Sequence, residues 1–270
     1  GVIGSGASVV PVDLQLGRKP LHRVLEMADV RLGFSIRERA DALLNADEGL
    51  NLVVLDGKHE NAATWEEFAA EEPGELAVTE PEAEAAVFFT SGTTGTVKGV
   101  PLTHANIAHQ ISTLVDSDLV SPDDTMLLPL PLHHVYPFVV SVLLPLALGM
   151  TIVIPASLTG PELVKAMRQG RVSVIVAVPR LYSALLDGIA ANAESRGPLG
   201  SLLFSAMLDL SLLVRRTTGV RVGKWLLAPV HREFGRDLDV VASGGAPLRP
   251  ETAWKLEAMG WRVSVGYGLT

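Results

Sequence analysis

Cysteine is absent from the 270 residues of this chain. Its absence excludes a disulfide scaffold, a thiolate metal site and a cysteine nucleophile, and it fits a reducing cytoplasm. Aromatic residues make up only 5% of the chain, whereas apolar residues reach 48%. Such an apolar content can fill a substantial core, so extensive disorder is not expected.

Several functional patterns are also missing. No serine stands in the G-x-S-x-G elbow of the serine hydrolases. Val97 stands where a Walker loop beginning at Gly92 needs glycine and lysine, and the spaced glycines of a dinucleotide fingerprint are absent. Residues 1–13 lack the basic region and long apolar core of a signal peptide.

The net charge of −8 is concentrated in one window. Asp56 to Glu84 holds ten acidic residues against Lys58 alone, so the remainder is about neutral. A nucleic-acid-binding protein would be more broadly basic, and no nucleic-acid partner is expected. Residues 195–236 carry a net positive charge, with seven lysines and arginines against Asp209 and Glu233.

Strand-like apolar runs alternate with helix-like segments along the whole chain, which predicts an α/β fold of mostly parallel sheets covered by helices. The expected strands are Val9–Val12, Arg31–Phe34, Asn51–Leu55, Ala85–Thr90, Met126–Leu130, Thr151–Ile154, Val172–Val178, Leu238–Ser243 and Arg262–Tyr267. The expected helices are Lys19–Ala28, Ile36–Asn45, Trp65–Ala70, His104–Val115, Pro161–Gln169, Arg180–Ala193, Leu199–Val214, Val222–Phe234 and Glu251–Met259.

The run Val135 to Ala156 is nearly free of polar groups and long enough to cross a membrane. Pro137, Pro145, Gly149 and Pro155 interrupt it. We therefore interpret it as a buried helix followed by a central strand.

The sharpest local signal is the string from Phe88 to Gly99. A strand leads into seven consecutive threonine, serine and glycine residues, and Lys98 follows two residues after them. Glycines let backbone N–H groups approach phosphate oxygens, hydroxyls add neutral donors, and a lysine adds a point charge suited to a polyphosphate. By composition alone a flexible polar loop remains an alternative.

The string TSGTTGTVKGV closely resembles the phosphate-loop signature of the adenylate-forming superfamily, which includes acyl-CoA synthetases, luciferases and peptide-synthetase adenylation domains. That signature normally has proline where this chain has Val97, so a looser loop is expected. The resemblance implies that the loop holds the β- and γ-phosphates of ATP. The residues implied are Thr90, Ser91, Gly92, Thr93, Thr94, Gly95 and Lys98, with Thr90 also contacting Mg²⁺.

Three further segments resemble family signatures, in the family's order. The segment from Leu130 to Tyr136 resembles Pro-Leu-x-His, in which His134 matches the histidine that borders the acyl pocket. The segment from Ser243 to Leu248 resembles the loop lining the adenine and acyl pocket, which implicates Gly245 and Ala246. The last five residues, Gly266, Tyr267, Gly268, Leu269 and Thr270, resemble the adenine-stacking segment, with Tyr267 facing the purine and Thr270 reaching the phosphate or its magnesium.

The resemblance implies that residues 1–270 are an internal portion of the large N-terminal adenylation domain. The extreme N-terminus, a magnesium-binding glutamate after Thr270, the small C-terminal domain and its catalytic lysine would then lie elsewhere. It further implies an ATP-dependent acid–thiol ligase that forms acyl-AMP and then an acyl-CoA, with coenzyme A as co-substrate and Lys98, His134 and Thr270 in catalysis. Residues 1–270 alone are expected to be inactive or nearly so.

About sixty residues separate Tyr182 from Ser243, and this long interval resembles the long-chain acyl-CoA synthetases. Within it, Leu199–Val214 is apolar and flanked by arginines, a pattern that suits an anionic bilayer surface as well as a helix packed on the domain. We expect a cytoplasmic protein, with peripheral membrane contact and homodimer formation left open. The alternatives are a fatty acyl-AMP ligase that loads a carrier protein and a non-catalytic module that binds acyl groups or nucleotides.

Overall fold

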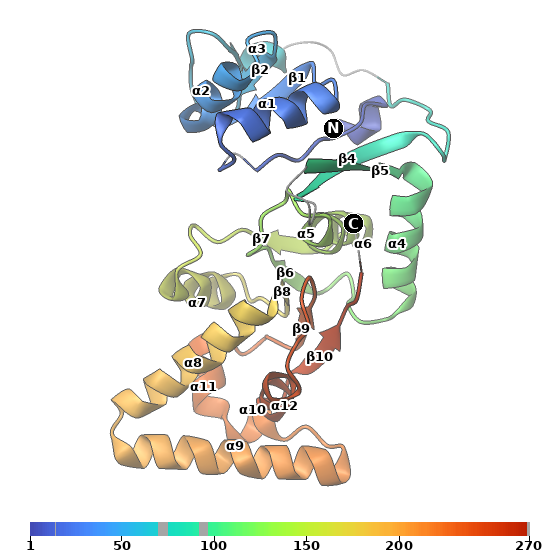
Figure 1. Cartoon of the computed structure of the whole chain (residues 1–270). Helices are drawn as coiled ribbons and strands as arrows, with labels where there is room; N and C mark the ends of the chain where they lie inside the picture. Colours follow the sequence, from blue (N-terminus) through green and yellow to red (C-terminus); the bar gives the residue numbers. More distant parts are fainter. Residues whose placement is uncertain (14, 70–74, 92–96, 269–270) are drawn as a thin grey trace. The chain divides into compact units, whose positions relative to one another are not determined.

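The computed structural model describes residues 1–13, 15–69, 75–91 and 97–268 (Figure 1). The chain forms two compact units. Among the described residues, the first comprises Gly1–His109 and His133–Val135, and the second comprises Gln110–Leu132 and residues 136–268. Each unit has its own sheet and its own apolar core.

The first unit contains a small parallel sheet of order β1-β2-β3 and a separate two-stranded hairpin. Its elements are η1 (Ile3–Ser5), α1 (Arg18–Met27), β1 (Leu32–Ser35), α2 (Arg37–Ala46), β2 (Asn51–Val54), β3 (Ala63–Thr64), α3 (Trp65–Phe68), β4 (Glu84–Ser91), β5 (Val97–Thr103) and the start of α4 (His104–Asp116). Leu21 and Leu25 of α1, Leu43 of α2, and Leu52 and Val54 of β2 fill the core. Their helical and alternating spacings turn one face of each element inward.

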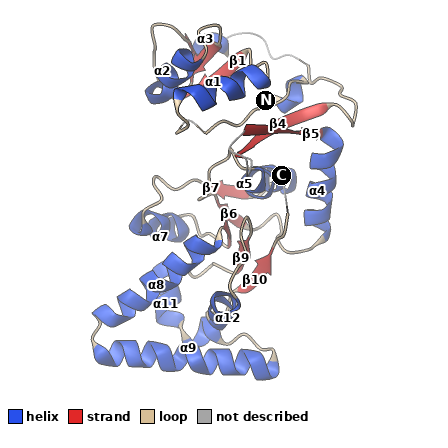
Figure 2. Ribbon diagram, viewed as in Figure 1, coloured by secondary structure: helices blue, strands red, loops and turns tan. Residues whose placement is uncertain are grey.

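The second unit is built around a five-stranded sheet whose order is β10-β9-β8-β6-β7 and whose strands are all parallel (Figure 2). Its elements are β6 (Thr125–Leu127), α5 (Val135–Phe138), η2 (Val139–Leu143), α6 (Leu144–Leu148), β7 (Thr151–Val153), α7 (Gly160–Gln169), β8 (Val174–Ala177), α8 (Pro179–Ser195), α9 (Pro198–Thr218), α10 (Gly223–Leu226), α11 (Ala228–Phe234), β9 (Val240–Ser243), α12 (Pro250–Ala258) and β10 (Arg262–Val265).

The middle of this sheet is buried on both faces. Every residue of β8 is buried, as a continuous apolar run in a parallel sheet requires. Leu127, Tyr182 and Trp261 lie in the core and are each 1% exposed. The predicted α/β architecture with a helix-covered parallel sheet is therefore confirmed.

The apolar helix that follows β6 contains one widened turn. The N–H of Leu144 donates to the carbonyl of Val139, five residues back, and the next residue, Pro145, has no N–H with which to close a normal α turn. The predicted helix followed by a strand is present. However, β7 lies at the edge of the sheet and not at its centre, because β6 pairs with β7 on one side and with β8 on the other.

Three other predictions need correction. The expected strand Val9–Val12 is reduced to a single bridge between Val9 and Ala86, since Pro11 has no N–H to continue a ladder. The expected helix Val222–Phe234 is two helices, α10 and α11, because Pro229 cannot donate to the carbonyl of Trp225. Residues 97–103, which were not expected to be a strand, form β5.

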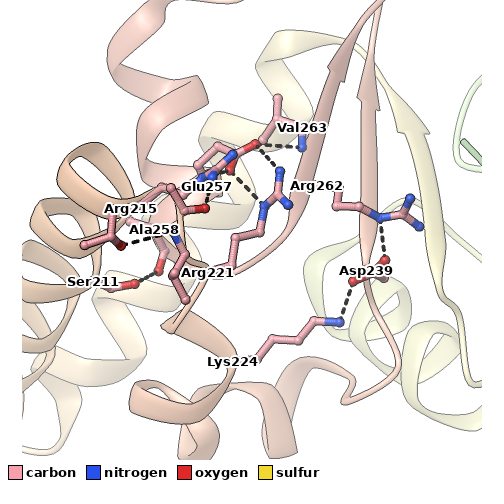
Figure 3. Close-up of polar contacts among 12 residues, drawn as sticks. Ser211, Arg215, Arg221, Lys224, Asp239, Glu257, Ala258, Arg262 and Val263 are labelled. Atoms are coloured by element: carbon pink, nitrogen blue, oxygen red, sulfur yellow. Dashed lines mark hydrogen bonds and ion pairs between the residues drawn. The ribbon is translucent and has the colours of Figure 1, made fainter.

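Two carboxylates organise the region around α9, α10, α12 and the start of β10 (Figure 3). Glu257 accepts from Arg215 Nε at 2.7 Å, from Arg221 Nε at 3.0 Å and from the N–H of Val263 at 3.2 Å. Asp239 accepts from Lys224 Nζ and from Arg262 Nε, both at 2.7 Å. Helix ends and strand starts are thereby joined by charge-assisted hydrogen bonds.

Burial opposes ionisation of Glu257, but hydrogen bonds from Arg221, Arg215 and Val263 outweigh it and hold the pKa of this carboxyl below its ordinary value. A lowered pKa in the folded state means that the carboxylate stabilises the fold above its unfolded pKa and that this contribution is lost as pH falls through the folded pKa. The Glu257 side chain is 12% exposed, so screening by solvent is limited.

We therefore expect Glu257→Gln to lower the free energy of unfolding by about 1.5–3 kcal/mol at neutral pH, the range for hydrogen bonds to charged groups. The difference from the wild type should shrink below the ordinary carboxyl pKa, where the wild-type carboxylate also takes up a proton. Thermal unfolding at neutral and acidic pH measures both. The exposed Asp209→Asn serves as the control, and identical melting temperatures for Glu257→Gln and wild type at neutral pH would contradict the expectation.

Candidate functional site

The first unit brings a predicted hydroxyl and the predicted lysine together. β4 and β5 pair as an antiparallel hairpin in which Thr90 stands directly opposite Lys98 and Ser91 opposite Val97. Side chains of directly opposed residues share one face, with Cβ atoms about 4.5–5.5 Å apart. The half-buried Thr90 and the exposed Lys98 therefore present a hydroxyl and an ammonium group side by side at the end of the hairpin.

The hairpin is held in place by an aromatic residue on each face of β4. Phe88 is 1% exposed in the core, and the Phe89 ring lies across the strand against Gly99. A Cβ on Gly99 would lie 3.2 Å from Phe89 Cε1. The glycine before Val100 thus leaves room for the ring. The predicted ligands Gly92, Thr93, Thr94 and Gly95 lie outside the described residues, as does Thr270.

Two adjacent histidines follow β6 and belong to the first unit. Their ring centroids are 4.3 Å apart, and His133 Nε2 lies 3.9 Å from an Asp13 carboxylate oxygen. Burial and the neighbouring His134 lower the pKa of His133, while Asp13 opposes that change. The predicted acyl-pocket residue, His134, is exposed.

In the second unit the predicted adenine-binding loops meet at one edge of the sheet. β9 and β10 are parallel neighbours, so Ser243 and Val265 end their strands side by side. The N–H of Gly266 donates to the carbonyl of Ser243 at 2.8 Å, and the N–H of Gly244 donates to the carbonyl of Ala177 at the end of β8, at 3.2 Å.

The predicted residues Gly245, Ala246, Gly266, Tyr267 and Gly268 therefore follow adjacent carboxyl ends of parallel strands. Tyr267 is 94% exposed, which leaves its aromatic face open to a planar ligand. The order of the sheet reverses between β6 and β8, and open α/β sheets bind ligands at the carboxyl ends next to such a reversal.

Two tyrosines shape this edge and were not predicted as site residues. Tyr136 and Tyr182 both donate their hydroxyl hydrogen to the carbonyl of Ala242, at 3.2 and 2.8 Å. Burial raises the pKa of both phenols, so both remain neutral donors at physiological pH. Tyr136 stands two residues after His134, and its place in the same signature segment could have marked it as a site residue.

Tyr136 also explains why Gly244 is a glycine. A Cβ at position 244 would lie 2.6 Å from Tyr136 Cζ and 2.8 Å from Cε2, closer than packed atoms allow. The next residue, Gly245, is a glycine for a different reason. Its φ is 74°, a left-handed conformation that favours glycine.

The fit of a magnesium ion can be judged from the oxygen atoms present. No group of three or more histidine, aspartate or glutamate residues that could hold a metal occurs within the described ranges. The half-buried Thr90 hydroxyl supplies one neutral oxygen, which suits a Mg²⁺ ion whose remaining ligands are water and nucleotide phosphates. These residues therefore fit magnesium that arrives with a nucleotide.

Comparison with known proteins decides the family. The family model described as AMP-binding enzyme matches residues 1–270, the whole chain. The chain belongs to the AMP-binding enzyme family. The predicted resemblance to adenylate-forming enzymes is thereby confirmed.

Relatives of this AMP-binding chain include coenzyme A ligases of different acids. It is 30% identical over 198 residues to the peroxisomal long chain acyl-CoA synthetase 7 of Arabidopsis thaliana, an alignment that covers 70% of this chain and 27% of that protein. It is 38% identical over 125 residues to the mitochondrial malonate–CoA ligase of Mus musculus, which covers 44% and 21%. The chain thus spans about a quarter of the length of these relatives.

The fold agrees with solved structures of adenylate-forming enzymes. An anthranilate CoA ligase in complex with anthranoyl-AMP superposes with a TM-score of 0.74 at 15% identity, over 99% of this chain and 46% of that one. Such a similarity at low identity establishes the fold alone.

The contact between Gly244 and Tyr136 predicts a position-specific effect on stability. Gly244→Ala should displace the Tyr136 ring and weaken its hydrogen bond to Ala242, lowering the free energy of unfolding by about 1–3 kcal/mol, as overpacking does. Gly268→Ala is the matched control, since no atom lies within 4 Å of a Cβ there. Thermal unfolding compares the two variants, and equal melting temperatures would refute the role assigned to the Gly244 contact.

Proposed function

We propose that the full-length protein is an ATP-dependent acid–CoA ligase that activates a long-chain fatty acid as acyl-AMP and transfers the acyl group to coenzyme A. The observation that carries the proposal is the cross-strand pair of Thr90 and Lys98 at the end of a hairpin whose connecting string is threonine, serine and glycine. Membership of the AMP-binding enzyme family and relatives named as acyl-CoA synthetases support it.

In the first half-reaction a carboxylate oxygen of the fatty acid attacks the α-phosphorus of ATP. The bond from that phosphorus to the bridging oxygen breaks, and pyrophosphate leaves. A carboxylate is already ionised at neutral pH, so the step needs no general base. Catalysis then depends on alignment of the phosphates and neutralisation of their charge.

In this proposal the β4–β5 hairpin binds the phosphates of ATP. Lys98 supplies a positive charge, and the Thr90 hydroxyl donates to a phosphate oxygen or contacts the magnesium ion bound to ATP. Ser91, Gly92, Thr93, Thr94 and Gly95 complete the loop, and Thr270 contacts the phosphate or its magnesium. In the second unit, Gly245, Ala246, Gly266, Tyr267 and Gly268 would hold adenine, and His134 would border the acyl group.

In the second half-reaction the sulfur of coenzyme A attacks the acyl carbonyl carbon. AMP leaves with the bridging oxygen, and the thiol proton passes to solvent. Mg²⁺ bound to ATP supplies charge neutralisation during the first half-reaction.

The proposal includes a cytoplasmic location, peripheral contact with a membrane and the formation of a homodimer.

Removal of the Lys98 charge tests the phosphate role. In the full-length protein, Lys98→Ala should reduce fatty-acid-dependent pyrophosphate exchange by about 10²–10³-fold, the cost of deleting one preorganised group at a developing charge. Lys98→Arg, which keeps the charge, should retain more activity.

Lys165→Ala is the matched control, because Lys165 is an exposed lysine of α7 that pairs with Glu162 at 3.4 Å. Exchange by Lys98→Ala at the level of this control would remove Lys98 from the site. Absence of ATP-dependent exchange in the wild type with every acid tested would refute the ligase assignment.

A panel of acids tests the substrate class. Palmitate and oleate should release AMP faster than acetate, malonate or ferulate, and product should accumulate as a thioester only when coenzyme A is added. Preference for malonate or an aromatic acid would replace the long-chain assignment. Acyl-AMP that is not consumed by coenzyme A would favour a carrier protein as the acceptor.

A further inference from the structure

Helix α9 carries a row of solvent-exposed leucines. Leu199, Leu202, Leu203, Leu210 and Leu213 are between 49% and 75% exposed. Their spacing, with Ala206 between them, places them on one face of the helix over about 21 Å, at a rise of about 1.5 Å per residue. We name these five leucines the α9 stripe.

The other face of α9 is packed on the second unit. Phe204, Met207 and Leu208 contact the core, and the Ser211 hydroxyl donates to the carbonyl of Ala258 at 2.6 Å. A surface helix normally turns its polar face outward, but α9 is apolar on both sides.

An apolar stretch of 18 residues in α9 has a mean hydropathy of 1.4, yet only 6% of it is buried. Within the described part of the chain this is the one helix long and apolar enough to cross a membrane. Because its other face is packed, it fits a helix that lies along a membrane surface better than one that spans it.

The cations around α9 are mostly paired, although a positive excess remains because Glu257 and Asp239 each bind two cations. Glu257 binds Arg215 and Arg221, and Asp239 binds Lys224 (Figure 3). Glu233 binds Arg196 at 2.6 Å. The guanidinium carbon of Arg216 lies 4.8 Å from the centre of the Trp254 ring. These cations are therefore held against acidic or aromatic groups of the protein, whereas the stripe itself carries no charge.

The chemistry of the stripe and its surroundings points to lipid. Its members are all aliphatic, and the Thr217 and Thr218 hydroxyls donate to carbonyls of their own helix, at 2.8 Å each. Trp225 of the neighbouring α10 is 79% exposed, and tryptophan favours the interface between headgroups and acyl chains.

A largely apolar cavity of about 190 Å³, whose walls also include Asn192, Arg196 and Glu233, opens beside the stripe. Leu203 belongs to both, and the walls come from α8, α9 and α11. They include Ile189, Phe204, Met207, Val230 and Phe234. A hydrocarbon chain that contacts the stripe thus has further apolar surface within reach.

The stripe lies away from the candidate nucleotide-binding edge. α9 packs on the end of α12, which leads into the amino end of β10, whereas Gly245 and Tyr267 follow the carboxyl ends of β9 and β10 (Figure 1). A bilayer against the stripe would leave that edge open to water-borne nucleotides.

We propose that the α9 stripe binds a lipid bilayer by inserting its leucines at the boundary of headgroups and acyl chains. Because apolar area drives the contact, neutral lipid suffices, and salt has little effect. The purpose we give it, supply of a fatty acid from the membrane, rests on the proposed function. The contact itself is testable without any activity.

Flotation of the full-length protein with phosphatidylcholine vesicles tests the contact. The wild type should bind them at low and at high salt, and Leu202→Ser/Leu210→Ser/Leu213→Ser should bind at least tenfold less. Leu76→Ser/Leu158→Ser, which alters two exposed leucines outside α9, should bind like the wild type. Equal binding by both variants, or wild-type binding only to phosphatidylserine vesicles with loss at high salt, would overturn the proposal.

A second measurement does not depend on the triple variant folding. Residues 1–270 contain no cysteine, so Leu210→Cys and Leu158→Cys each add one labelling site for an environment-sensitive fluorophore once any cysteine elsewhere in the full-length protein is replaced by serine. The label at 210 should shift to the blue with phosphatidylcholine vesicles, and the label at 158 should not. The absence of a shift at 210 would refute insertion.

Sedimentation of the same preparations separates lipid binding from self-association. A dimer that the serine substitutions dissociate would identify the stripe as an interface between copies and overturn the proposal. Pyrophosphate exchange by these preparations measures the ligase activity separately. The proposed ligase function and the proposed membrane contact can therefore be refuted independently.

Discussion

Parallel pairing of β8, β9 and β10 is the constraint on which the candidate site of the second unit depends. Parallel strands all end at one edge of a sheet, so the segments that follow them meet there although 66 residues separate the ends of β8 and β9 and 22 separate the ends of β9 and β10. The hydrogen bond from Gly266 to Ser243 joins two of these segments directly. Tyr136 and Tyr182 then hold the edge by sharing the carbonyl of Ala242.

The first unit brings its own candidate residues together by a different means. An antiparallel hairpin places Thr90 opposite Lys98, and Gly99 makes room for Phe89 beside them. The phosphate site that we propose on this hairpin differs from the strand-to-helix loops of Walker and dinucleotide-binding proteins. Here the lysine belongs to β5, the strand that pairs with β4.

Two partly buried carboxylates of the second unit contribute to stability and also position cations near α9. Glu257 and Asp239 hold Arg215, Arg221, Lys224 and Arg262 against the protein and neutralise part of their charge. What remains exposed is a helix face of leucines. An apolar surface binds by the area it buries, so its preference among lipids differs from that of a basic patch.

The sequence by itself determined the fold class and the chemical character of the candidate ligands, because strand and helix periodicity and the hydroxyl, glycine and lysine content of residues 90–98 are local properties. Prolines limited the prediction where their missing N–H broke an element, as at Pro11 and Pro229. Only the tertiary structure decided that Thr90 faces Lys98, that Tyr136 packs on Gly244, and that the arginines around α9 are engaged. Those outcomes depend on residues far apart in the chain, such as Arg215 and Glu257, whose meeting no local pattern encodes.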